Sequence, residues 1–143
     1  SFPRGRNVFG SLFFKRDKVV LDRVHEVAEI AYLDEVLHSE AGSLSHGQKQ
    51  WLEVGMLLIQ DPALLMLDEP VAGMSKSERV KTGDLLRNIA QGRSVIVIEH
   101  DMDFVKDIAH WVTVMHQGKV LSEGNMDAVQ KDPKVIEVYL GHS

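Results

Sequence analysis

The sequence has no cysteine, few aromatic residues and no long apolar run. None of its 143 residues is cysteine, and 6% are aromatic. The chain therefore forms no disulfide framework, and its composition suits a reducing compartment. Its longest apolar runs, such as residues 56–59, are far shorter than the about 18 residues that a membrane-spanning helix needs. A hydrophobic content of 44% fits a globular core, in one compact domain or part of one.

Basic residues are outnumbered in most of the chain. The net charge is −5, from 16 Lys and Arg against 21 Asp and Glu, which argues against a general nucleic-acid binder. Residues 1–23 differ, because they hold six basic and two acidic side chains; 10 of the 16 basic and 19 of the 21 acidic residues follow them. We interpret this basic start as a solvated segment. The alternative is a surface that meets a partner or a membrane headgroup layer.

The usual marks of a polypeptide start are also missing. The chain does not begin with Met, and its first residues, SFPRGR, lead into no apolar signal-peptide core. We therefore expect it to begin in the middle of a larger protein.

An all-helical piece comes first. Val20, Val24 and Val27 follow helical spacing, which predicts a helix over residues 18–33, and a shorter helical piece can follow it. Ser45 has Gln48 three residues later, the capping-box pattern that opens a helix. That helix is expected to run to about residue 60, where Asp61-Pro62 stops it.

From residue 62 onward strands and helices alternate, which indicates a layered α/β sheet. Short apolar runs over 63–67 and 94–99 predict strands buried on both faces, as in parallel sheets. A third strand and an antiparallel return follow over 111–115 and 119–122. Expected helix starts are Ser75 in a second capping box with Glu78, Asp101 or Asp103, Asn125 and Pro133.

Two acids, Asp68 and Glu69, follow the first apolar strand. Open α/β sheets bind ligands at the carboxyl ends of their strands, and successive strand side chains point to opposite sides. We therefore expect the two carboxylates to act at two different positions of a bound ligand. Asp68 suits Mg²⁺, held through a coordinated water, and Glu69 suits a role in orienting or deprotonating an attacking water. The alternative is an ordinary acidic turn.

His100 lies just beyond the second strand. An imidazole there can donate a hydrogen bond to a terminal phosphate and position the attacking water. A histidine after a strand is more often structural or merely exposed; its place after the Asp-Glu strand favours the functional interpretation.

The turn Ser45-His46-Gly47-Gln48 opens a helix, and helix N-termini bind anions through amides and the helix dipole. Gly47 has no Cβ, so a phosphate can approach its backbone closely. The alternative is a plain capping box. The apolar helix that follows favours the anion site.

Taken in order, LSHGQ at 44–48, the strand ending in Asp68-Glu69 and the strand leading to His100 resemble the second half of an ABC-type ATPase. LSHGQ is similar to the signature motif, 64–68 to the Walker B strand, Glu69 to the catalytic glutamate and His100 to the switch histidine. Residues 70–75 correspond to the D-loop, with Ser75 where many members have Asp. His46 occupies the variable third signature position and carries no expected role.

The resemblance implies part of a P-loop NTPase (RecA-like) parallel sheet core, residues 62–143, preceded by part of the ABC helical subdomain, residues 1–61. It implies Mg²⁺ and ATP as cofactors and a head-to-tail dimer with a second ATPase subunit. Ser45, Gly47 and Gln48 would then contact the partner's ATP, and Ser75 would lie in the D-loop. Asp68, Glu69 and His100 would serve the chain's own nucleotide.

The resemblance further implies transmembrane permease subunits, contacted through residues 1–40, and indirectly a periplasmic or extracellular solute-binding protein. The place would be the cytoplasmic face of the plasma membrane, as a peripheral subunit. The ending VIEVYLG resembles importers of branched-chain amino acids and urea, and LSHGQKQWLE with LDEPVAGM is closest to the urea type. No nucleic-acid partner is expected.

One motif of the family is missing. The Walker A pattern G-x-x-x-x-G-K-[ST], which cradles phosphates, occurs nowhere in the chain. We therefore expect the isolated chain to be inactive and, because the sheet loses its P-loop strand, to be unstable, swapped or paired with a missing piece. The alternatives are a non-catalytic interaction or regulatory fragment of an ABC ATPase and a soluble ABC protein of DNA repair or translation. The acidic balance after residue 23 argues against the last.

Overall fold

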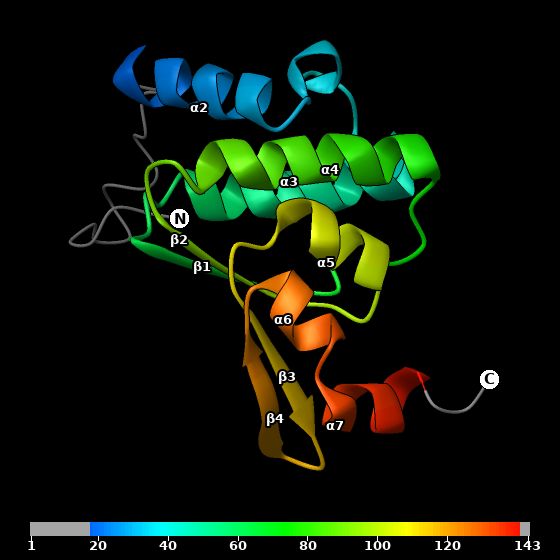
Figure 1. The fold of residues 1–143 in the computed structure, drawn as a ribbon. Helices are drawn as coiled ribbons and strands as arrows, with labels where there is room; N and C mark the ends of the chain where they lie inside the picture. Colours follow the sequence, from blue (N-terminus) through cyan, green and yellow to red (C-terminus); the bar gives the residue numbers. More distant parts are fainter. Residues whose placement is uncertain (1–17, 141–143) are drawn as a thin grey trace. The chain divides into compact units, whose positions relative to one another are not determined.

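The computed structural model describes residues 18–140, which form two compact units that meet in sequence between Ile98 and Glu99 (Figure 1). The first unit holds the longer helices and a parallel pair of strands, and the second holds an antiparallel pair and shorter helices. The expected boundary at residue 61, which separates the two functional subdomains, stays a prediction. In the described part of the chain no helix is long and apolar enough to span a bilayer.

The helices of the first unit begin where the sequence predicts. They are α2 (Lys18–Ile30), the 3₁₀ turns η1 (Asp34–Val36) and η2 (Ala41–Ser43), α3 (His46–Leu58) and α4 (Lys76–Ile89). The first ends earlier than predicted, because Tyr32 adopts a left-handed φ of 57° and the Leu33 amide donates to Ala28 O at 2.8 Å.

Both predicted capping boxes are present. Ser45 caps α3 and Ser75 caps α4, each accepting from the backbone of the residue three positions on. Figure 1 shows α3 and α4 running side by side. They are joined by a buried hydrogen bond of 2.9 Å from Trp51 Nε1 to Thr82 Oγ1.

The parallel sheet pairs β1 (Leu64–Asp68) with β2 (Ser94–Ile98), in a register that sets Asp68 opposite Ile98. The two predicted strands and their parallel pairing are confirmed. Their carboxyl ends therefore lie at one edge of the sheet.

The prediction that both strands are buried on both faces is wrong. Along β1, Leu65 and Leu67 are buried while Leu64 and Met66 are exposed, and Met66 is 61% exposed. On β2, Ile96, the register partner of Met66, and Ile98, the partner of Asp68, are exposed as well. The physical reason is that the described residues of this unit cover the sheet on one side only, so the alternating side chains divide into a covered and an open face.

The first helix of the second unit is α5 (Met102–Ile108), which Asp101 caps by accepting from the Phe104 amide at 3.1 Å. This selects Asp101 over Asp103 as the cap. The remaining elements are β3 (Val112–His116), β4 (Lys119–Gly124), α6 (Met126–Gln130), α7 (Pro133–Val135) and the π-helical turn η3 (Ile136–Leu140).

Strands β3 and β4 are antiparallel, with a bulge between Val114 and Met115. Asn125 caps α6 and Pro133 stands in the first turn of α7, as predicted. The Tyr139 hydroxyl donates to Met115 O at 2.6 Å, which fixes the last turn against the hairpin.

Candidate functional site

The tip of α3 carries the first candidate residues. Ser45 is exposed, its amide donates to Gln48 Oε1 at 2.9 Å, and its hydroxyl accepts from the Gln48 amide at 3.2 Å. Both bonds of the capping box are thus made inside the chain. The Ser45 hydroxyl keeps its own proton, which is available to a phosphate oxygen.

The amide of Gly47 has a partner that the sequence did not reveal. Gly47 is buried, and a Cβ built on it would come within 2.4 Å of Glu78 Oε1. The Gly47 backbone also lowers the pKa of Glu78 by hydrogen bonding, although Ser75 is the larger cause. We predicted that a phosphate can approach the Gly47 backbone closely. In the structure, the Glu78 carboxylate of the same chain makes such an approach.

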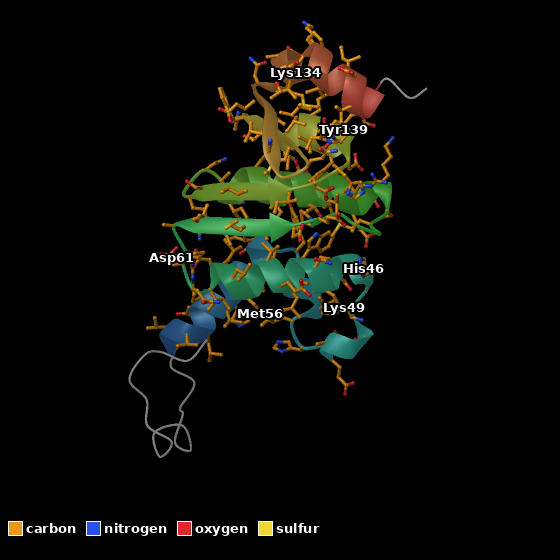
Figure 2. All side chains as sticks on the ribbon, turned by 90° about the horizontal axis from the view of Figure 1, so that it is seen from below. His46, Lys49, Met56, Asp61, Lys134 and Tyr139 are labelled. Carbon is orange, nitrogen blue, oxygen red and sulfur yellow. The ribbon has the colours of Figure 1, made fainter. Side chains whose placement is uncertain are left out.

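His46 lies next to the D-loop. Its Nε2 is 2.9 Å from Ala72 O, and a Cβ on Gly73 would stand 3.4 Å from the same nitrogen. Figure 2 shows His46 and Lys49 together at one end of this unit, away from Asp61. The variable third signature position is therefore in contact with residues 70–75, where we expected no role.

Asp68 and Glu69 stand at the end of β1, and both are exposed. Glu69 has a φ of 47°, in the left-handed region that a residue with a side chain seldom adopts. Its amide donates to Ile98 O at 2.9 Å, which fixes the turn to the end of β2. Because Glu69 leaves the extended conformation, its carboxylate does not continue the strand alternation.

His100 belongs to the second unit, so its predicted place beside Asp68 and Glu69 stays a prediction. Its side chain is 78% exposed. The neighbouring Glu99 carboxylate, only 2% exposed, accepts from the amides of His100 and Asp101 at 3.0 and 3.3 Å. Glu99 therefore fixes the backbone that carries the imidazole, a role that sequence reasoning missed.

The described residues contain no cluster of three or more His, Asp or Glu side chains able to hold a metal ion. A single exposed carboxylate nevertheless fits Mg²⁺ that keeps its waters and takes its other ligands from a nucleotide. Asp68 offers that chemistry.

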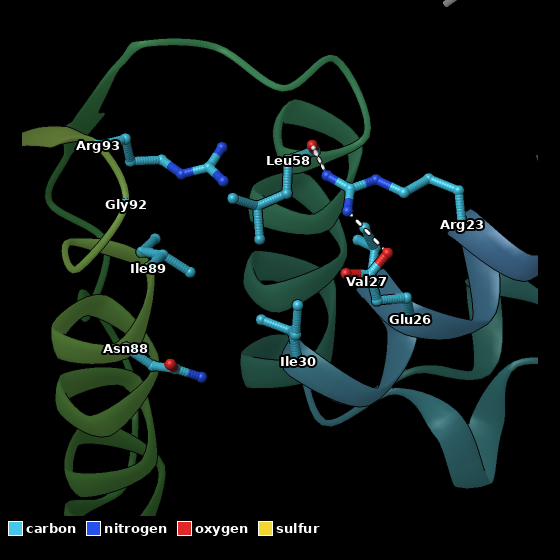
Figure 3. A pocket seen from close by; sticks show the side chains of 9 residues that line it. All are labelled: Arg23, Glu26, Val27, Ile30, Leu58, Asn88, Ile89, Gly92 and Arg93. Carbon is cyan, nitrogen blue, oxygen red and sulfur yellow. Dashed lines mark hydrogen bonds and ion pairs between the residues drawn. The ribbon is translucent and has the colours of Figure 1, made fainter.

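A cavity of about 220 Å³ lies elsewhere in the first unit, near the end of α4. Figure 3 shows Arg23 and Arg93 reaching towards it from opposite sides. Arg23 pairs with Glu26 at 2.7 Å, and Arg93 lies 3.4 Å from Asp61. Because each cation has a carboxylate neighbour, we do not assign an anion site here.

Comparison with known proteins shows the family to which this chain belongs. The family model "ABC transporter" matches residues 4–72, and the model "Branched-chain amino acid ATP-binding cassette transporter" matches residues 119–143. A solved ATP-binding cassette of an ABC transporter, in its ADP conformation, superposes with a TM-score of 0.78 at 29% identity. The chain belongs to the ABC transporter ATPase family. It has that family's mixed α/β fold, and the match to this cassette covers 96% of the chain and 58% of the cassette.

The matched relatives carry transport names. A probable branched-chain amino acid transport ATP-binding protein of Archaeoglobus fulgidus is 33% identical over 96% of the chain and 55% of its own length. A high-affinity branched-chain amino acid transport ATP-binding protein of Pseudomonas aeruginosa is 35% identical over 92% and 52%. The chain therefore spans about half the length of these curated relatives.

Proposed function

We propose that this ABC ATPase chain supplies the signature, Walker B, D-loop and switch parts of an ATP-hydrolysing importer subunit. The observation that carries the proposal is the parallel β1–β2 pair, which ends in Asp68 and Glu69 in the unit that also exposes the Ser45 tip of α3. The two family models, which match residues 4–72 and 119–143, support it.

The site residues divide the chemistry. Glu69 orients or deprotonates the water that attacks the γ-phosphate, and His100 donates a hydrogen bond to that phosphate. Asp68 holds Mg²⁺ through water, and the ion neutralises charge on the phosphates. Ser45, Gly47 and Gln48 close on the nucleotide of a second subunit, with Ser75 in the adjoining D-loop.

The names of the relatives support transport of branched-chain amino acids. The motif runs LSHGQKQWLE and LDEPVAGM favour urea as the solute. In either case the partners are a second ATPase subunit and transmembrane permeases, and the subunit is peripheral on the cytoplasmic face of the plasma membrane. Uptake of labelled urea and labelled leucine by cells lacking this gene separates the two solutes.

The test uses this chain together with a Walker A-bearing segment, either joined on one polypeptide or added as a second polypeptide. We call this the assembled ATPase. Glu69→Gln should keep Mg·ATP binding and lower turnover by about 10²-fold or more, because a catalytic base is lost. Glu53→Gln removes the same charge from the exposed side of α3 and should keep wild-type turnover. Normal hydrolysis in the Glu69 variant would contradict the proposal.

A second candidate is a non-catalytic interaction or regulatory fragment. The observation that favours it is the missing Walker A pattern. Calorimetric titration of the 143-residue chain with Mg·ATP separates the two: millimolar or no affinity favours the fragment, and micromolar affinity favours a nucleotide-binding subunit.

A further inference from the structure

We propose that Glu78 and His46 are positioning residues that tie the signature turn, residues 44–48, to the D-loop, residues 70–75, within one chain. The tie makes the two segments meet the partner's nucleotide as one piece. This inference rests on the proposed function for its consequence, while the tie itself is a property of the fold.

Glu78 joins the starts of two helices. Its Oε2 accepts from the Ser75 amide at 2.9 Å and from the Ser75 hydroxyl at 2.7 Å, which caps α4. Its Oε1 is the atom next to Gly47, in the first turn of α3. One carboxylate thus satisfies backbone donors at two positive helix ends, where an anion is stabilised.

His46 makes a second connection between the same two segments. Its Nε2 lies 2.9 Å from Ala72 O and so donates to it, and a Cβ on Gly73 would stand 3.4 Å from the same nitrogen. Gly73 has a φ of 71°, a backbone conformation that residues with a side chain seldom adopt. The two connections run in parallel, so loosening the signature turn from the D-loop requires breaking both.

The charges agree with this geometry. The hydrogen bonds from the Ser75 side chain and backbone lower the pKa of Glu78, and the charge of His46 and the Gly47 backbone lower it further. The ionisable group that faces Glu78 from the other segment is His46. The carboxylate is therefore held ionised where it accepts from both helices.

The tie gives Gly47 a second reason to be glycine. A methyl group at this position would overlap Glu78 Oε1 and Cδ, at 2.4 and 2.8 Å. Since these atoms end a flexible side chain, Gly47→Ala should push the carboxylate off the amide and leave the helix folded. If contact with the partner's phosphate were the sole reason for glycine at position 47, the effect of Gly47→Ala would not depend on Glu78.

The first experiment needs no nucleotide. In amide NMR spectra of the chain, or of the assembled ATPase if the chain alone gives no dispersed spectrum, the Gly47 signal should move as Glu78 titrates. Glu78→Gln should abolish that movement, whereas Glu53→Gln should leave it. A Gly47 amide that ignores the titration of Glu78 would overturn the tie.

The second experiment measures ATP hydrolysis by the assembled ATPase. Glu78→Ala should raise the KM for ATP about three- to tenfold, the cost of ordering a loosened segment on binding. The kcat should stay within about twofold, because the groups at the reacting phosphate are unchanged. Glu78→Gln should fall between wild type and Glu78→Ala, since its amide offers one acceptor oxygen for two helix starts.

A double-variant cycle completes the test. In a Gly47→Ala background, Glu78→Ala should raise the KM no further, because the carboxylate is already displaced. Gly42→Ala, in open space, is the matched glycine control. Effects that multiply, or an unchanged KM in Glu78→Ala, would overturn the inference. Hydrolysis that does not depend on Glu69 would instead refute the proposed function and leave the NMR result standing.

Discussion

At the scale of single residues, the fold lowers the pKa of the Asp132 side chain. The Ser122 hydroxyl, then the Lys134 amide and the Lys134 charge, lower the pKa of Asp132 below its ordinary 3.8. A carboxyl whose pKa falls on folding stabilises the folded state above its unfolded pKa. That contribution disappears as the pH drops through the folded pKa.

We predict that Asp132→Asn, which keeps a side-chain cap on α7, is less stable than wild type at neutral pH. The difference should shrink as the pH falls below about 3.8, because wild-type Asp132 then loses its charge as well. Melting followed by circular dichroism across this range is the measurement. A difference that is the same at every pH would contradict the assignment.

Some residue roles were open to sequence reasoning and others were not. Ser45, Ser75 and Asn125 act through neighbours three positions away, so local spacing predicts their caps. His46 and Glu78 act across 26 and 31 positions of sequence, through contacts with Ala72 and Gly47. Such contacts exist only once α3 and α4 are packed, and no local pattern encodes them.

At the scale of elements, one buried hydrogen bond connects α3 to α4. Thr82 is fully buried, and its hydroxyl accepts from Trp51 Nε1 and lies 2.9 Å from Glu78 O. The bond joins the helices that carry the signature turn and the D-loop cap.

We predict that Thr82→Val lowers the free energy of unfolding by about 1–3 kcal/mol, because the buried Trp51 donor is left without an acceptor. Thr82→Ser keeps the hydroxyl and should lose less. Urea denaturation measures both. A loss in Thr82→Ser as large as that in Thr82→Val would contradict this, because Thr82→Ser keeps the acceptor for Trp51 and loses only a methyl group.

We predict the opposite sign for Gly55→Ala in the middle of α3. A Cβ there would lie 3.5 Å from Val27 Cγ1 and 3.7 Å from Ala31 Cβ, which is ordinary contact. Alanine should stabilise the helix by about 0.5–1 kcal/mol. A lower urea midpoint than wild type would mean that α2 cannot accommodate the methyl group.

The strands mark the limit of prediction for elements. Their positions and parallel pairing followed from apolar runs bounded by polar residues. Their burial did not, since it depends on what covers each face. Leu64 and Met66 are as apolar as Leu65 and Leu67, yet only the latter pair is covered.

At the scale of the whole molecule, the parallel sheet of the described residues has one open face. Leu64, Met66, Ile96 and Ile98 form an exposed apolar face beside the candidate catalytic acids. An exposed apolar surface of this kind is typical of a site that another segment or protein covers. We propose the Walker A-bearing segment as that occupant.

We predict that adding a separately expressed Walker A-bearing segment lowers the fluorescence of a hydrophobic dye bound to this chain and creates ATP binding. Met66→Asp should prevent both effects, because it places a charge on the open face. Val19→Asp, a similar change at an exposed position of α2, should not. Equal assembly by the two variants would contradict this occupant.

The fold class followed from the order of motifs and elements, and the structural comparison confirms it. The head-to-tail dimer stays a prediction. Whether the exposed Ser45 tip meets a partner's nucleotide remains a prediction.

The central claim is tested most directly by sedimentation velocity of two assembled ATPase variants with Mg·ATP. Glu69→Gln should sediment as an ATP-bound dimer, because hydrolysis no longer ends the closed state. Adding Ser45→Arg should give a monomer that still binds ATP, since the proposed role of the tip is to close on the other subunit's nucleotide. A double variant that dimerises as well as Glu69→Gln alone would contradict the account.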